Sequence, residues 1–162
     1  MKNQKGLGLI GTIFLVIIIA IVVFAVVYFI RLQTEKEALE DLKIDMLLVQ
    51  AKVKTIAGDY TLEDEDTKVL QGTKLSEMED QEEIKEFLEK ELFDPEEKGK
   101  QYYVLNQEDL NNLELTQVQL EEGTFYIVEY TQAQVYITKG FEYVDGNTYY
   151  EIKEIENLEV EE

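Results

Sequence analysis

Residues 7–30, LGLIGTIFLVIIIAIVVFAVVYFI, contain no charged side chain and decide how the rest of the chain is organised. A helix rises about 1.5 Å per residue, so this run is long enough to cross a hydrocarbon core of roughly 30 Å. A secretory signal peptide has an apolar stretch of only about 7–15 residues and a small-residue cleavage site, which residues 28–31, YFIR, do not offer. The segment therefore predicts a transmembrane helix that stays with the protein.

The charges on either side of this segment predict its orientation. Lys2 and Lys5 precede the segment, whereas Arg31 is soon followed by the first acidic residue, Glu35. The positive-inside rule then places the N-terminus in the cytoplasm and the rest of the chain outside it. Three of the 15 basic residues and none of the 35 acidic residues precede Leu32, so the remainder carries a net charge of -23. Because such a surface repels phosphates, we expect no direct binding of nucleic acid.

The sequence KGLGLI at residues 5–10, followed by an unbroken apolar helix, resembles the N-terminus of type IV prepilins and pseudopilins. In that family a short basic leader ending in glycine stays in the cytoplasm. A prepilin peptidase removes it and usually methylates the new N-terminus. The resemblance implies cleavage between Gly6 and Leu7 and N-methylation of Leu7. Leu7 stands where phenylalanine is commoner in the family, and Gly8 stands where threonine is commoner.

Gly11 is the main departure from the family pattern, because most members carry a glutamate there that pairs with the charged N-terminus of a neighbouring subunit. Without this carboxylate, an ammonium group in lipid lacks its partner, which is energetically costly. The departure favours a minor subunit over the main filament subunit. The alternative is an uncleaved single-pass anchor. Residues 6–11 also match G-x-G-x-x-G, but no strand precedes them, so we reject a dinucleotide site.

A second helical pattern follows the apolar segment. Apolar residues recur three and four positions apart and so share one stripe of a helix: Leu39, Leu42, Met46, Val49, Val53 and Ile56. Gly58 is the predicted stop. The stripe fits either a two-stranded coiled coil or packing against a sheet of the same chain. Fewer than three full heptads favour the sheet, and the pilin resemblance implies the same architecture.

The composition excludes several kinds of functional site. The chain has no histidine, no cysteine and a single serine, Ser76, so it cannot form a catalytic triad or a usual zinc site. The acidic cluster at residues 63–66 invites a calcium hypothesis, but it lacks the D-x-[DN]-x-[DN]-G pattern, and a solvated turn is favoured. We therefore expect no catalytic residue, no metal site, no cofactor and no enzyme activity.

The remaining residues predict a small sheet with short helices. A helix is expected over residues 77–93, with a capping box of Ser76 and Glu79 and an end at Asp94-Pro95. A helical turn is expected over residues 108–113. The expected strands are 102–105, 118–120, 125–130, 135–138, 141–144 and 149–152, with hairpin turns at 121–123 and 145–148.

These elements predict an α+β fold in which a long N-terminal helix packs on a small antiparallel sheet. The predicted organisation is a leader (1–6), a transmembrane helix (7–30), an amphipathic helix (31–58) and an acidic extracytoplasmic head (59–162). The predicted function is structural: a minor pilin-like or pseudopilin-like subunit, assembled through its hydrophobic helix into a pilus or a secretion or competence pseudopilus. The expected partners are the membrane, a prepilin peptidase and other pilin or pseudopilin subunits. The alternative is an uncleaved single-pass membrane protein with an acidic extracytoplasmic interaction domain.

Overall fold

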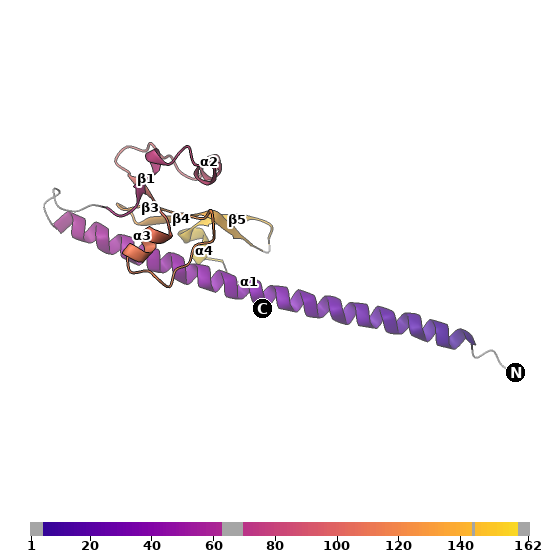
Figure 1. The fold of residues 1–162 in the computed structure, drawn as a ribbon. Coiled ribbons are helices and arrows are strands. Elements are labelled where there is room, and N and C mark those ends of the chain that lie inside the picture. Colours follow the sequence, from indigo (N-terminus) through magenta and orange to yellow (C-terminus); the bar gives the residue numbers. More distant parts are fainter. Residues whose placement is uncertain (1–4, 63–69, 144, 159–162) are drawn as a thin grey trace. The chain divides into compact units, whose positions relative to one another are not determined.

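The fold was analysed in a computed structural model, which describes residues 5–62, 70–143 and 145–158, with side chains at the N-terminal end described from Thr12 onward. It contains a long helix, a five-stranded sheet and several short helices, in agreement with the predicted α+β class (Figure 1). The elements are α1 (Lys5–Leu62), β1 (Thr73–Lys74), the 3-10 helix η1 (Leu75–Glu77), α2 (Glu82–Leu88), β2 (Tyr102–Leu105), α3 (Gln107–Asn112), β3 (Tyr126–Glu129), β4 (Gln134–Glu142), β5 (Thr148–Glu151) and α4 (Ile152–Glu156).

The chain divides into two compact units, and the boundary falls within α1. One unit comprises the first half of α1 up to Ala38, and the other begins at Leu39 and contains the second half of the helix together with the sheet. We call this second unit the head. The helix continues past Gly58 to Leu62, so the predicted stop at Gly58 is wrong. A single glycine costs a helix only about 1 kcal/mol, which the neighbouring turns tolerate.

The sheet is a simple antiparallel meander in which spatial order follows chain order, β1-β2-β3-β4-β5. Its register places Tyr102 opposite Glu129, and Ile127 opposite Tyr136. The structure gives one strand, β4, where the sequence predicted two separate strands at 135–138 and 141–144. The pairing of β4 with β5 shifts between Tyr136 and Phe141, which marks a bulge within a continuous strand.

Two glycines permit close backbone approaches at the ends of this sheet. At Gly72, φ is +100°, and an added Cβ atom would lie 2.7 Å from the carbonyl oxygen of Val104. At Gly140, in the bulge of β4, φ is +70° and a Cβ atom would lie 2.6 Å from the ring of Tyr150. Both positions combine a left-handed backbone with a lack of space, so any side chain would strain them.

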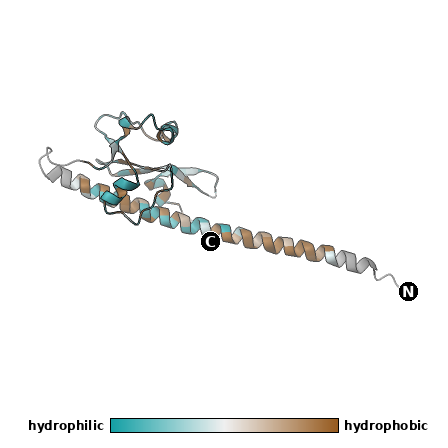
Figure 2. Cartoon of the chain, viewed as in Figure 1, coloured by the Kyte–Doolittle hydropathy of each residue, from teal (hydrophilic) through white to brown (hydrophobic). Residues whose placement is uncertain are grey.

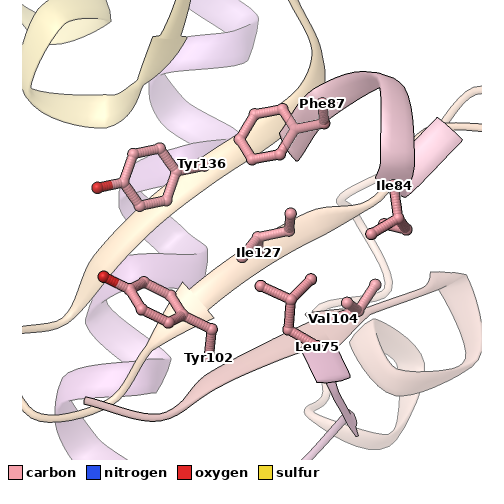
Figure 3. Packing of buried hydrophobic residues seen from close by; sticks show 7 residues of the cluster. All are labelled: Leu75, Ile84, Phe87, Tyr102, Val104, Ile127 and Tyr136. Carbon is pink, nitrogen blue, oxygen red and sulfur yellow. The ribbon is translucent and has the colours of Figure 1, made fainter. Parts of the chain in front are cut away.

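The two faces of the sheet carry separate packing layers (Figure 1). One layer packs against η1 and α2, and it comprises Leu75, Ile84, Phe87, Tyr102, Val104, Ile127 and Tyr136 (Figure 3). Phe93 completes this layer, because its ring centroid lies 4.2 Å from that of Tyr102 and 4.8 Å from that of Tyr136. The second half of α1 packs on the other face, with Leu39, Met46, Val49 and Val53 buried. The predicted packing of α1 against a sheet is therefore confirmed.

Several local predictions differ from the structure. The helix predicted over 77–93 is shorter, because Leu75–Glu77 form η1 and α2 begins only at Glu82. Ser76 lies inside η1, so the capping box with Glu79 is wrong. A capping box does occur at α3, where Asn106 and Asp109 exchange hydrogen bonds of 3.0 Å. This helix confirms the helical turn predicted over 108–113.

The predicted strand 118–120 is also wrong. A turn does occur at 121–124, closed by the bond from the Thr124 N–H to the Glu121 carbonyl oxygen, but it does not join two strands. Val118 is buried, but its segment lies in the connection between α3 and β3, where hydrophobic burial does not need a strand partner. The short edge strand β1 and the C-terminal helix α4 were not predicted. Strand β1 has only two residues, which is too short to show an alternating pattern in the sequence. Helix α4 begins directly after β5, so no turn residue separates the two elements in the sequence.

Candidate membrane and assembly surface

The first half of α1 presents apolar side chains on all sides. Phe14, Phe24 and Phe29 have exposed fractions of 63%, 76% and 67%, and the other large apolar residues between Ile13 and Ile30 are similarly exposed. Figure 2 shows the hydrophobic character of this part of the helix. By length and composition, α1 is the one helix in the described parts of the chain that could cross a membrane. Such a large apolar surface needs lipid or other protein around it.

The predicted processing site lies at the beginning of this helix. Residues 1–4 of the predicted leader lie outside the described residues, whereas Gly6 and Leu7 belong to the first turn of α1. This first turn contains no acidic residue, and the first one in the sequence is Glu35. If cleavage occurs after Gly6, the new ammonium group at Leu7 has no carboxylate in its own transmembrane segment. Any counter-charge there has to come from another molecule.

The second half of α1 has a buried apolar stripe against the sheet and, on another side, a few exposed apolar residues. Ile44 and Leu47 lie outside the buried stripe, with exposed fractions of 55% and 40%. They belong to a row of residues spaced alternately four and three positions apart, which places the row on the side of the helix away from the sheet. We call this row the outer seam: Glu40, Ile44, Leu47, Ala51, Lys54 and Gly58.

Polar contacts between the second half of α1 and the rest of the head determine which side of the helix faces the sheet. The Gln50 side-chain amide donates to the carbonyl oxygen of Ala133 at 3.1 Å, and the Lys43 ammonium donates to the carbonyl oxygen of Leu158. Lys52 lies 3.5 Å from the Glu114 carboxylate. Because these contacts hold the helix in one rotation, they also determine that the outer seam stays uncovered within the head.

Among the acidic residues described on this part of α1, Asp45 is the one whose pKa is shifted. Partial burial raises the pKa of Asp45 above its ordinary value, and the charge of Asp41 adds to the effect. The carboxylate of Asp45 in turn contributes to raising the pKa of Tyr126, for which burial is the main cause. The Tyr126 hydroxyl therefore remains protonated at neutral pH. Burial is the main cause of both pKa shifts, and a neighbouring carboxylate adds to each.

The described residues of the head contain no group of three or more acidic, histidine or cysteine side chains that could hold a metal ion. The cluster at residues 63–66, for which calcium was weighed, lies outside the described residues. Some carboxylates of the head instead pair with a single lysine, for example Glu97 with Lys100 at 2.9 Å.

Sequence reasoning missed the outer seam, although its signal was present. The sequence predicted a single apolar stripe on this helix, whereas the 4-3-4 spacing of Glu40, Ile44, Leu47 and Ala51 marks a second row. A search for two separate heptad rows, instead of one broad apolar face, would have found it. Comparisons with protein-family models, with curated proteins and with solved structures find no match to this chain.

Proposed function

We propose that the chain is a minor pilin-like or pseudopilin-like subunit, processed by a prepilin peptidase and assembled through α1 into a pilus or a secretion or competence pseudopilus. The observation that carries the proposal is the combination of the KGLGLI sequence at residues 5–10 with one helix that continues from an apolar segment into a sheet-backed head. Neither feature alone distinguishes a pilin from an ordinary anchored protein. Together they supply a processing site, a helix for packing and a compact outer domain.

In this proposal, each part of the molecule has a mechanical role. The peptidase cuts between Gly6 and Leu7 and methylates the amine of Leu7. The apolar half of α1 then leaves the bilayer laterally and packs among equivalent helices, which cover the side chains exposed between Ile13 and Ile30. The removed leader, with Lys2 and Lys5, stays in the cytoplasm, and the acidic head lies outside, as the positive-inside rule requires of the precursor. The outer seam, with Ile44 and Leu47 exposed, extends the surface available to neighbouring helices beyond the membrane.

Gly11 and the lack of an acidic residue in the first turn of α1 support a minor position in the assembly. A subunit without the usual glutamate cannot supply the counter-charge that the N-terminus of a neighbour requires in lipid. Its own N-terminal ammonium can still pair with the glutamate of a different subunit. A subunit of this kind suits the end of a filament better than its repeating body.

Intact-mass spectrometry after co-expression with an active prepilin peptidase tests the proposal. We expect an N-terminus at Leu7 carrying a methyl group, and an unprocessed N-terminus for Gly6→Ala. Gly8→Ala is the matched control, because it makes the same change two residues later and should leave processing intact. An intact N-terminus in the unaltered chain, in cells where a known prepilin is cut, would disprove the proposal.

That contrary outcome would favour the second candidate function, an uncleaved single-pass anchor for an acidic interaction domain. The absence of a carboxylate at Gly11 is the specific observation in its favour, because a chain that is never cut has no N-terminal ammonium to neutralise within the membrane.

A further inference from the structure

The turn between β4 and β5 contains the one aspartate in the sequence that is followed by glycine, Asp145, and no asparagine in the sequence is followed by glycine. An aspartyl side chain can react with the backbone nitrogen of the next residue. A glycine at that position favours the reaction, because it has no side chain to hinder the approach. Asp145 and Gly146 are both exposed, and a Cβ atom added at Gly146 would have no neighbour within 4 Å. Sequence and access therefore single out the Asp145–Gly146 bond.

The reaction at such a bond needs no co-reactant other than water. The nitrogen of Gly146 forms a bond to Cγ of the protonated Asp145 carboxyl group, and the hydroxyl of that group leaves as water with the proton of the nitrogen. The product is a cyclic imide, and water then adds to one of its two carbonyl groups. Opening at Cγ restores aspartate. Opening at the main-chain carbonyl carbon leaves isoaspartate, in which the main chain runs through the former side chain.

In the folded head, both reacting groups already form other bonds. The Asp145 carboxylate accepts hydrogen bonds from the Asn147 backbone N–H at 2.8 Å, the Asn147 side-chain amide at 2.9 Å and the Tyr149 hydroxyl at 2.7 Å. The Gly146 N–H donates to the carbonyl oxygen of Tyr143 at 2.9 Å. The imide has no N–H and retains only one of the two carboxyl oxygens. Ring closure therefore removes the bond to Tyr143 and at least one of the bonds to the carboxylate.

The same bonds keep the carboxyl group ionised. They lower the pKa of Asp145, and the bond from the Asn147 backbone has the largest effect. A carboxylate has no hydroxyl that can leave as water, so a lower pKa leaves a smaller reactive fraction at a given pH. Folding thus opposes the reaction both through the bonds that ring closure breaks and through the charge of Asp145.

Isoaspartate at this position would alter the edge of the sheet. It adds one carbon atom to the main chain within the hairpin, where the Tyr143 N–H donates to the Asn147 carbonyl oxygen at 2.9 Å. Strand β5 leads directly into α4, whose Ile152 and Ile155 are buried. A longer turn therefore disturbs the pairing of β4 with β5 and the packing that follows it.

We propose that the Asp145–Gly146 bond is the site at which this chain spontaneously forms isoaspartate, and that the hydrogen bonds of Asn147 and Tyr149 to Asp145 slow this reaction in the folded head. The folded and the unfolded chain then react at the same position but at different rates. The site lies in the head and does not depend on processing of the N-terminus.

Incubation of the full chain in detergent micelles, with and without concentrated urea, tests this site. Trypsin cleaves after Lys139 and Lys153 and so releases residues 140–153 as one peptide. Chromatography against synthetic peptides with aspartate or isoaspartate at position 145 separates the two forms, whose masses are equal. We expect isoaspartate to form roughly 10-fold faster in urea, because the hydrogen bonds at Asp145 are lost. Asp145→Glu should form none, since the corresponding ring is larger and closes much more slowly.

Two adjacent tyrosines provide the matched comparison. Tyr149→Phe keeps the ring that contacts Tyr143 but removes one donor to Asp145, so isoaspartate should form roughly 2- to 5-fold faster in the folded chain. Tyr150→Phe makes the same change at a hydroxyl that is not among the donors to Asp145, and the rate should not change. Asn147→Ala removes only the side-chain donor and should accelerate the reaction as Tyr149→Phe does.

Three results would overturn the proposal. They are equal rates of isoaspartate formation in the folded chain and in urea, isoaspartate at other positions but not at 145, and equal rates in Tyr149→Phe and Tyr150→Phe when the amide NMR spectra of both show an intact hairpin. If Tyr149→Phe loses the hairpin, the comparison of the unaltered chain with and without urea decides the matter.

Discussion

Glu129 is the one acidic side chain that is completely buried among the described residues. Its carboxylate accepts hydrogen bonds of 2.7 Å from the backbone N–H groups of Thr131 and Gln132, in the turn between β3 and β4. The same turn contains Ala133, whose positive φ of 53° is unusual for a residue with a side chain. The carbonyl of Ala133 also accepts the bond from Gln50 of α1. Glu129 therefore shapes a turn to which the long helix is attached.

Replacing Glu129 by alanine should destabilise the head by about 1–3 kcal/mol, because two backbone donors lose their charged acceptor. Glu129→Gln should cost less, since the amide retains one carbonyl acceptor. Urea unfolding of the full chain in micelles, followed by tyrosine circular dichroism, measures both. Glu122→Ala, at an exposed carboxylate, is the control and should change little. Equal stability of all three variants would show that the turn forms without Glu129.

Asp145 has the opposite environment, an exposed position with several local donors. Its carboxylate accepts hydrogen bonds from the Asn147 backbone N–H at 2.8 Å, the Asn147 side-chain amide at 2.9 Å and the Tyr149 hydroxyl at 2.7 Å. These bonds, with the backbone bond first, lower the pKa of Asp145 below its ordinary value. Because the pKa of Asp145 is lower in the folded protein than in the unfolded chain, its ionised carboxylate stabilises the folded turn at pH values above the ordinary aspartate pKa. This stabilisation is lost as the pH falls through the lowered pKa of the folded protein.

The local structure at Asp145 should therefore be independent of pH from about 5 to 8 and should loosen below about pH 4, the ordinary range for aspartate. The NMR contact between the rings of Tyr143 and Tyr149, whose centroids are 6.2 Å apart, reports this loosening. In Asp145→Asn the contact should not depend on pH. The same acid response in both proteins would assign it to another group.

At the scale of the element, α1 is one continuous helix whose two halves have different surroundings. Its first half is apolar on all sides, whereas its second half has a buried stripe and an exposed outer seam on opposite sides. Ile44 and Leu47 are exposed on the side of the helix that the sheet does not cover, where a partner could contact them. The second half of α1 is thus both the support of the sheet and a candidate contact surface.

Two substitutions at adjacent residues separate these roles. Met46→Ala should destabilise the head by about 2–5 kcal/mol, because Met46 is completely buried against the sheet. Leu47→Ala should cost less than about 1 kcal/mol in the isolated protein, because its site is already partly exposed. Urea unfolding in micelles compares them. If Leu47→Ala costs as much as Met46→Ala, the outer seam is covered in the isolated protein.

At the scale of the whole molecule, charge is the dominant surface property. The chain carries a net charge of -20, and ion pairs such as that of Lys139 with Glu121 lie at exposed positions. Exposed pairs of this kind contribute little stability. Repulsion among the remaining carboxylates opposes the compact state, and it also opposes the close approach of two copies of the head.

Added salt should therefore stabilise the head. Raising sodium chloride from about 10 mM to about 500 mM shortens the Debye length from roughly 30 Å to below 5 Å and should raise the melting temperature by several degrees. A variant with Glu96→Lys, Glu122→Lys and Glu156→Lys, all at exposed positions, should respond less. Thermal circular dichroism in micelles measures both. A melting temperature that falls with salt in the unaltered chain would show that its ion pairs outweigh the repulsion.

The sequence alone predicted the features that depend on local composition and periodicity. The uncharged run at residues 7–30 is long enough to indicate a membrane helix without any knowledge of packing. The 3.6-residue period of the stripe from Leu39 to Ile56 identified the helical face that meets the sheet, and alternating strand residues gave the α+β class. The proposed cleavage after Gly6 rests on residues 5–10 and remains a prediction.

Tertiary structure alone decided the features that depend on residues far apart in the chain. Whether 118–120 becomes a strand depends on the availability of a pairing edge, and the joining of two predicted strands into β4 depends on Gly140 fitting against Tyr150. The exposure of the outer seam likewise follows from the contacts that fix the rotation of α1. The physical reason is that periodicity reports which residues share a face, whereas only the packed chain determines what covers that face.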